Sequence, residues 1–208
     1  MPSQPISEFQ FGELLIETEK SKNRFIAKRD SLFYEILYYL GLRPMECRCI
    51  ELNHINFNEH TIFIPAENNK ERQSDTINIP DFLWVKIIRY LNEREIESKW
   101  LFPSCLNSQR KKDYCVCYKQ TERTFDNRMR RLGYLHISFI DRNKKPRYNL
   151  NLYSFRKRFG TFVYRKTRDP QTTALMLRQY DKQLKSVWRY VFAVQKEDRK
   201  DIINHLYS

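Results

Sequence analysis

The chain has 208 residues, of which 38 are Lys or Arg and 25 are Asp or Glu, so its formal net charge is +13 at pH 7. This charge favours a polyanionic partner, most simply nucleic acid, and without a polybasic tail or lipidation motif an anionic membrane surface is disfavoured. No apolar stretch approaches the roughly 18 residues of a membrane span, and the N-terminus lacks a signal-peptide pattern. We expect an intracellular, cytoplasmic protein with no membrane partner.

The first part of the chain is predicted to be helical. A helix from Ser7 to Ser21 begins at a Ser cap, and a second helix spans Ala27 to Leu40 with apolar residues at helical spacing. Gly41 ends the second helix, and Pro44 lies near the first turn of a short third helix. These helices would build the core of the domain.

Alternating apolar residues then predict a β-hairpin. The segments "HTIFIP" and "DTINIP" alternate with period two and flank a polar turn from Ala66 to Ser74. A helix capped by Asp81 follows, and residues 105–118 have the composition of a loop. Another helix stops at Gly133, and a strand, a charged turn and a second strand fill residues 136–152.

The last third is predicted to be helical again. The segment "YSFRKRFGTFVYRKT" predicts one helix, and "DPQTTALMLRQYD" predicts another, with an Asp-Pro cap at Asp169. The chain ends in a mostly helical segment from Leu184. There are no repeats, no low-complexity tract and no linker, so we treat the chain as one mainly helical domain with a small sheet.

The cysteines do not indicate a disulfide framework or a metal site. Their number is five, which is odd, and no secretory signal accompanies them. Cys47 and Cys49 fall in a predicted helix, where positions i and i+2 point about 200° apart and cannot share a metal. We expect small, buried, apolar side chains and no bound metal.

Five segments occur in a recognisable order. An Arg-Asp pair, an apolar helix and Gly-Leu-Arg-x-x-Glu form "RDSLFYEILYYLGLRPMEC". A lysine-containing hairpin turn, "LFPS", "LYSFRKRFGT" and "VWRYVF" follow. From about residue 28 to the end, this order resembles the catalytic domain of tyrosine recombinases, the phage integrase family.

The resemblance implies an α+β, mainly helical fold with a small antiparallel β-hairpin or sheet at one edge. Residues 28–208 would form the catalytic domain, and residues 1–27 would be a helical extension of the same domain. Because only about 27 residues precede the match, we expect the family's N-terminal DNA-clamping domain to be absent or truncated.

The resemblance also implies a reaction. A tyrosine hydroxyl attacks a phosphodiester of double-stranded DNA, a 3′-phosphotyrosyl link forms, and a 5′-hydroxyl leaves; a second hydroxyl reverses the step. No metal or cofactor is required. Two arginines suit this chemistry because guanidinium is always charged and offers paired donors to phosphate oxygens. Preorganised donors of this kind can be the largest catalytic contribution.

The motif positions assign the arginines. Arg43 fills the first arginine position, and Glu46, three residues later, is expected to orient it. Arg156 fills the second arginine position. Tyr153 stands where the family usually has histidine; on a helix it shares a face with Arg156, either as a hydroxyl donor to the phosphate or as an aromatic side chain packed over the site.

The remaining catalytic positions are less closely matched. Lys70 in the hairpin turn is the expected general acid, although another matching of the turn puts Glu67 there. Gln179 replaces the histidine of the family's "LGH" box. Tyr190 is the expected nucleophile, since Tyr180 and Tyr207 are less well placed.

Several basic residues are expected to contact DNA phosphates, which gives affinity and salt dependence. Family members assemble as tetramers on DNA, and the C-terminal segment "KDIINHLYS" could pack on a neighbouring protomer or on its own domain. The expected phosphate contacts are Arg128, Arg130, Arg131, Lys144, Lys145, Arg147 and Lys157.

The alternatives are a catalytically degenerate DNA-binding relative, a type IB topoisomerase or telomere resolvase-like enzyme, and an unrelated basic structural protein. The first of these is motivated by the vacated histidine positions at Tyr153 and Gln179. The resemblance favours a site-specific recombinase over all three.

Overall fold

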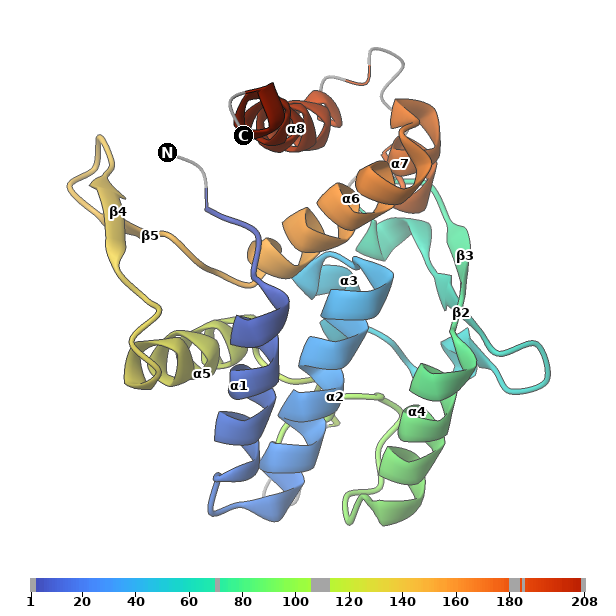
Figure 1. Cartoon of the computed structure of the whole chain (residues 1–208). Coiled ribbons are helices and arrows are strands. Elements are labelled where there is room, and N and C mark those ends of the chain that lie inside the picture. Colours follow the sequence, from blue (N-terminus) through green and yellow to red (C-terminus); the bar gives the residue numbers. More distant parts are fainter. Residues whose placement is uncertain (1–2, 70–71, 106–112, 180–183, 185, 207–208) are drawn as a thin grey trace.

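A computed structural model describes residues 3–69, 72–105, 113–179, 184 and 186–206 of the chain. Most elements are helices, and two small antiparallel sheets lie on opposite sides of the helical body (Figure 1). Within the described part, no helix is long and apolar enough to cross a membrane. The predicted mainly helical α+β class is confirmed.

Helix α2, Arg24–Leu40, is the central element of the larger core. It contacts α1 (Glu8–Glu19), α4 (Asp81–Glu93) and α6 (Tyr153–Thr167), which together cover several of its faces (Figure 1). The predicted apolar stripe on α2 is buried, and Tyr34 and Tyr38 outside that stripe are buried too. A helix enclosed on several sides buries more than one face.

Local signals fix the start of α1 and the end of α2. Ser7 caps α1, since its Oγ accepts from the backbone N of Gln10 at 3.1 Å. At the end of α2, Gly41 adopts the left-handed conformation with φ 60°. The predicted caps at Ser7 and Gly41 are therefore confirmed.

The predicted hairpin is present as β2, Thr61–Ile64, paired antiparallel with β3, Asp75–Asn78. Ile62 lies opposite Ile77 in this register. A short strand that the sequence did not predict, β1 (Ile55–Asn56), adds to the other edge of β2. The second sheet consists of β4, Ile137–Ile140, and β5, Pro146–Tyr148.

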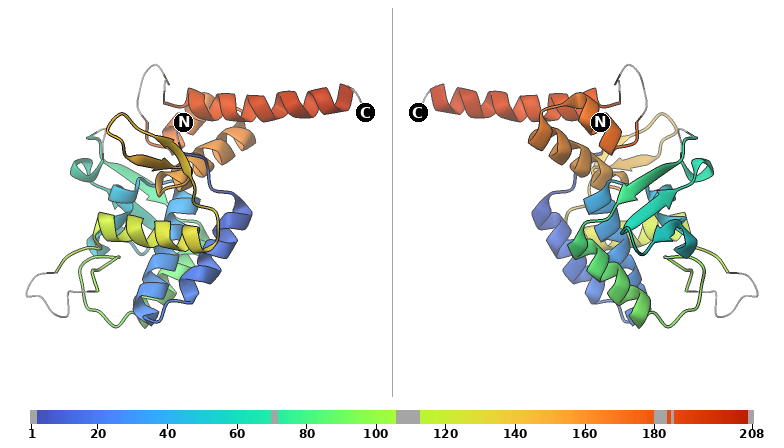
Figure 2. Two further views of the ribbon diagram at one scale, coloured as in Figure 1. Left: turned by 90° about the vertical axis from the view of Figure 1, so that its left-hand side faces the viewer. Right: turned by 90° about the vertical axis from the view of Figure 1, so that its right-hand side faces the viewer.

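The remaining helices and turns complete the fold. Their bounds are α3 Pro44–Arg48, α5 Tyr118–Arg131, α7 Pro170–Met176 and α8 Trp188–Leu206, with 3₁₀ turns at η1 Leu52–His54 and η2 Ala66–Asn68. Helices α6, α7 and α8 share a second, smaller core cluster. The first turns of α8 pack on this cluster, and its C-terminal part extends away from the rest of the fold (Figure 2).

Other details also differ from the sequence predictions. Pro80 is the N-cap of α4, and Asp81 is its first residue. Helix α7 ends at Met176, before the residues matched to the "LGH" box. Cys47 is buried as expected, but Cys49 lies just past α3 and is only partly buried, and Cys117 is exposed.

Candidate active site

The site is built on the turn between α2 and α3. Gly41 at this turn packs directly against α6, because a Cβ atom there would lie 2.3 Å from Phe159 Cδ1. The left-handed φ and the close approach both require glycine. The turn makes Arg43 the N-cap residue of α3, so its side chain starts from a fixed backbone position.

Arg43 and Glu46 hold each other in place. The Glu46 carboxylate accepts from the Arg43 backbone N through Oε2 and from Arg43 Nη1 through Oε1, both at 2.7 Å. Arg43 Nη1 also donates to Asn69 Oδ1 at 3.0 Å, next to the β2–β3 turn. Arg43 is 9% exposed, so its guanidinium is oriented but retains some access to solvent.

Arg156 on α6 approaches the same turn from the other side. Its Nη1 donates to the Gly41 carbonyl at 2.7 Å, and its Nη2 donates to the Leu177 carbonyl beyond α7. Burial, together with the charges of Arg43 and Arg178, lowers the pKa of Arg156 to about 9. The guanidinium stays protonated at neutral pH in a site that is rich in positive charge.

Arg178 is a third arginine at this site, and the sequence reading did not single it out. It follows α7 with φ 51°, is 2% exposed, and donates through Nη2 to Glu46 Oε2 at 2.9 Å. Burial would raise the pKa of Glu46, but the charges of Arg178 and Arg156 and the bonds from Arg43 hold it below its usual value. Glu46 is therefore an anion among three guanidinium groups.

Tyr190 lies in the first turn of α8, within the smaller core cluster. Its ring rests on Gly160 of α6, where a Cβ would lie 2.9 Å from Tyr190 Cε1 and Cζ. Burial raises the pKa of Tyr190, while the charges of Arg156, Arg189 and Arg43 act in the opposite direction. The expected nucleophile is thus within electrostatic range of both expected arginines.

Tyr153 and Gln179 are placed differently from this cluster. Tyr153 is the first residue of α6 and is 41% exposed. Gln179 is half-buried, and its Oε1 accepts from Ser186 Oγ at 3.0 Å, which links the end of α7 to the approach to α8. Tyr153 and Gln179 therefore remain predicted residues of the site.

The β2–β3 turn contains both positions matched to the family's general acid, Lys70 and Glu67. Lys70 lies outside the described residues, as do Tyr180 and Tyr207. Glu67, the alternative in this turn, is exposed in η2. Among the described residues, no group of three or more His, Cys, Asp or Glu side chains is arranged to hold a metal ion.

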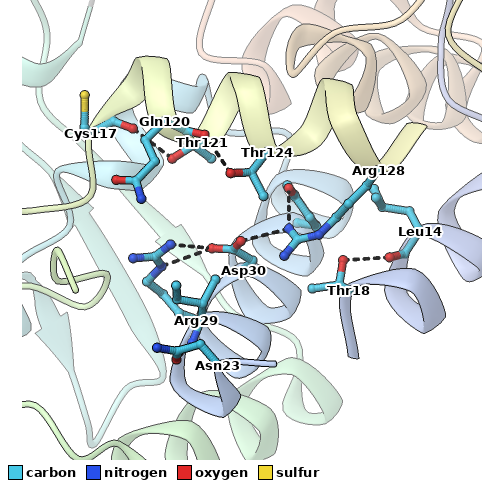
Figure 3. Close-up of polar contacts among 12 residues, drawn as sticks. Leu14, Thr18, Asn23, Arg29, Asp30, Cys117, Gln120, Thr121, Thr124 and Arg128 are labelled. Atoms are coloured by element: carbon cyan, nitrogen blue, oxygen red, sulfur yellow. Dashed lines mark hydrogen bonds and ion pairs between the residues drawn. The ribbon is translucent and has the colours of Figure 1, made fainter. Parts of the chain in front are cut away.

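The burial of Arg128 contradicts the expectation that this residue contacts DNA phosphates. It is 5% exposed, and its Nη1 donates to Asp30 Oδ2 at 2.8 Å and to the Tyr34 hydroxyl at 2.9 Å. Arg29 donates to the other oxygen of the same carboxylate, Asp30 Oδ1 (Figure 3). Arg128 therefore belongs to a buried network that joins α5 to α2.

The other basic residues lie at or near the surface. Arg131 pairs with Glu17 at 3.5 Å, and Lys157 is half-buried with its Nζ donating to the Ser3 carbonyl. The β4–β5 hairpin holds several of the exposed cations. The exposed residues of the predicted set are Arg130, Arg131, Lys144, Lys145 and Arg147.

Comparison with known proteins gives a family match across most of the chain. The sequence profile described as "Phage integrase family" matches residues 6–191. A curated relative, tyrosine recombinase XerC of Anoxybacillus flavithermus (strain DSM 21510 / WK1), is 42% identical over 50 residues. That segment is 24% of this chain and 17% of the relative.

Solved structures share the fold at low sequence identity. XerH recombinase bound to its difH substrate, post-cleavage, gives a TM-score of 0.65 at 15% identity, covering 89% of this chain and 48% of that one. The Tn1549 transposon integrase with transposon right end DNA gives 0.68 at 12%, covering 97% and 67%. The catalytic domain of bacteriophage HP1 integrase gives 0.57 at 16%, covering 92% and 88%. The chain thus spans about half the XerH chain and most of the HP1 domain.

Proposed function

Because the chain belongs to the phage integrase family, we propose that it is a site-specific DNA recombinase that cleaves and rejoins strands through a 3′-phosphotyrosyl intermediate. The observation that carries the proposal is the convergence of Arg43, Arg156 and Tyr190 from three separate elements. The charges of both arginines act on the Tyr190 hydroxyl. A phosphodiester bound by the two guanidiniums would therefore lie near a tyrosine.

The proposed step forms one bond and breaks one. The Tyr190 oxygen loses its proton and attacks phosphorus, the bond to the 5′-oxygen breaks, and that oxygen leaves as a hydroxyl after gaining a proton. Arg43 and Arg156 stabilise the negative charge that develops on the other phosphate oxygens. Lys70 remains our proposed acid for the leaving oxygen, and Tyr153 and Gln179 our proposed additional donors to the phosphate.

The proposed substrate is double-stranded DNA inside the cell. The net charge of +13 favours a polyanion. The exposed cations of the β4–β5 hairpin, with Arg130 and Arg131, are suited to phosphate contacts. Assembly of a tetramer on the DNA is part of the same proposal.

A covalent capture experiment tests the proposal without knowledge of the target sequence. The protein is incubated with a library of nicked duplexes of randomised sequence, in which the short fragment released on cleavage diffuses away and traps the adduct. We expect wild type to form a protein–DNA adduct that survives denaturation. Tyr190→Phe should form none, because it lacks the attacking oxygen.

Tyr164→Phe is the matched control, since Tyr164 is a buried tyrosine of the same core cluster. It should retain adduct formation. If wild type captures no sequence from the library, or if Tyr190→Phe still forms the adduct, the proposed mechanism is wrong.

The second candidate is a DNA-binding relative that has lost catalysis. The observation that favours it is the placement of Tyr153 and Gln179 at the two positions where the family usually has proton-transferring histidines. Salt-dependent duplex binding without any adduct would support this candidate. Relaxation of supercoiled plasmid would instead indicate a topoisomerase activity.

A further inference from the structure

We propose that Arg178 is a positioning residue of this site, which holds Glu46 and, through Glu46, orients the Arg43 guanidinium for phosphate binding. The inference rests on the proposed strand-cleavage function and assigns a role in it to a residue that was not among the predicted site residues. Three features of Arg178 carry the inference: its backbone conformation, its burial and its ion pair.

The backbone of Arg178 is strained. Its φ of 51° lies in the left-handed region, which glycine adopts freely and side chains with a Cβ adopt at a cost. The same position corresponds to the glycine of the "LGH" box. A strained residue persists only where its surroundings over-determine it, and such residues cluster at functional sites.

The burial of Arg178 adds a second cost. The side chain is 2% exposed, and its Nε has no hydrogen-bond partner among the described residues. A buried donor without a partner is unfavourable, and a buried charge is more so unless it is paired. The compensation visible in the structure is the ion pair of Nη2 with Glu46 Oε2 at 2.9 Å.

That ion pair fixes the carboxylate on which Arg43 depends. Glu46 Oε2 receives both Arg178 Nη2 and the Arg43 backbone N, and Oε1 receives Arg43 Nη1. Without Arg178, the negative charge of Glu46 would be directed mainly at Arg43 and would weaken its attraction for a phosphate. With Arg178 present, the Glu46 carboxylate can orient Arg43 while its negative charge is shared between the two arginines.

The location of Arg178 also ties the two catalytic arginines to one segment. The preceding residue, Leu177, supplies the carbonyl that receives Arg156 Nη2. Leu177 therefore contacts Arg156 directly, and Arg178 acts on Arg43 through Glu46. This segment leads from α7 toward α8, which carries Tyr190. Packing of this segment against the site would therefore position both arginines relative to Tyr190.

Two substitutions separate the charge of Arg178 from its bulk. Arg178→Met keeps an unbranched side chain without charge, and Arg178→Lys keeps the charge. The rate of adduct formation is measured at saturating nicked DNA, using a sequence captured by wild type, and DNA affinity is measured separately. We expect Arg178→Met to lower the rate by roughly 10- to 100-fold, by analogy with the loss seen when the hydrogen-bond partners of metal ligands are removed, with affinity little changed. Arg178→Lys should recover part of the lost rate.

A double-mutant cycle tests whether Arg178 acts through Glu46. In a Glu46→Gln background, Arg178→Met should have little further effect on the rate, because the group it orients has lost its charge. An undiminished effect in that background, a wild-type rate for Arg178→Met, or equal rates for the Met and Lys variants would overturn the inference.

Stability is followed in parallel by thermal unfolding. If Arg178→Met does not fold, the Lys variant alone decides: a rate reduced at unchanged DNA affinity and unfolding temperature supports positioning, and a wild-type rate overturns it. If wild type itself forms no adduct, the proposed function fails and this inference with it. A failure of the inference alone leaves wild-type cleavage intact, so the two failures are distinguishable.

Discussion

The ring of Tyr190, the candidate nucleophile, packs directly against Gly160 of α6. A glycine inside a helix costs roughly 1 kcal/mol relative to alanine. In return, the Tyr190 ring lies against the backbone of α6, where a Cβ would be 2.9 Å from Cε1 and Cζ of the ring and from Leu177 Cδ1. Gly160 lies about one turn beyond Arg156 on α6. The missing side chain therefore allows the tyrosine to approach the helix that carries the second arginine.

Replacing Gly160 by alanine should displace the Tyr190 ring. We expect Gly160→Ala to slow adduct formation by about tenfold or more, a loss of about 1.4 kcal/mol in transition-state stabilisation, because the new methyl group occupies the position of the ring. The rate at saturating nicked DNA and the free energy of unfolding are the measurements.

Gly12→Ala is the matched control. Gly12 also lies inside a helix, α1, but nothing lies within 4 Å of a Cβ built there. This variant should gain about 0.5–1 kcal/mol of stability and keep the wild-type rate. Wild-type cleavage by Gly160→Ala would show that this contact does not position the nucleophile.

In the buried network between α2 and α5, a basic residue stabilises the packing of the two helices. Arg128 and Arg29 bind opposite oxygens of the Asp30 carboxylate (Figure 3). Arg29 Nη1 also donates to the Pro103 carbonyl at 3.2 Å. Removing one member of a buried ion pair leaves the other members poorly compensated. The network therefore ties α5 and the segment before it to the central helix.

Arg128→Met should lower the free energy of unfolding by about 3 kcal/mol or more, measured by urea denaturation. The dependence of DNA affinity on salt should not change, because Arg128 does not reach the surface. Arg147→Gln on the exposed hairpin is the contrasting variant. It should leave stability within about 0.5 kcal/mol and reduce the salt slope by about one. A stable Arg128→Met with a reduced slope would make Arg128 a phosphate contact after all.

Elements were predictable from sequence where the deciding signal is local. The Ser7 cap, the Gly41 stop and the alternation of Ile62 and Ile64 all act within a few residues, and the structure reproduces them. The fate of Arg128 was not predictable in this way. Its partner Asp30 is 98 residues away in the chain, and a run of arginines gives no sign of which member points inward.

The candidate site was predictable to the extent that a family motif covers it. The motifs picked out Arg43, Glu46, Arg156 and Tyr190, which the structure brings together. Arg178 was not predicted as a site residue because its position corresponds to a glycine of the family motif and because α7 was expected to extend beyond it. One signal could have found it: an arginine at a position matched to glycine, next to a catalytic box.

At the scale of the whole molecule, the site lies where the two core clusters meet. The turn with Arg43 and Glu46 belongs to the part organised around α2, whereas Tyr190 belongs to the cluster of α6, α7 and α8. Arg156 and Arg178 bridge the two parts through the Gly41 carbonyl and through Glu46. The proposed chemistry therefore depends on the docking of the C-terminal helices.

Identification of the residue that carries the DNA tests this account most directly. The captured adduct is digested with nuclease and trypsin, and the modified peptide is sequenced by mass spectrometry. Cleavage after Arg189 and Lys196 would release "YVFAVQK", which begins at Tyr190. The account predicts that the nucleotide remnant is on Tyr190 in this peptide. A remnant on Tyr180, on Tyr207 or on any other residue would contradict it.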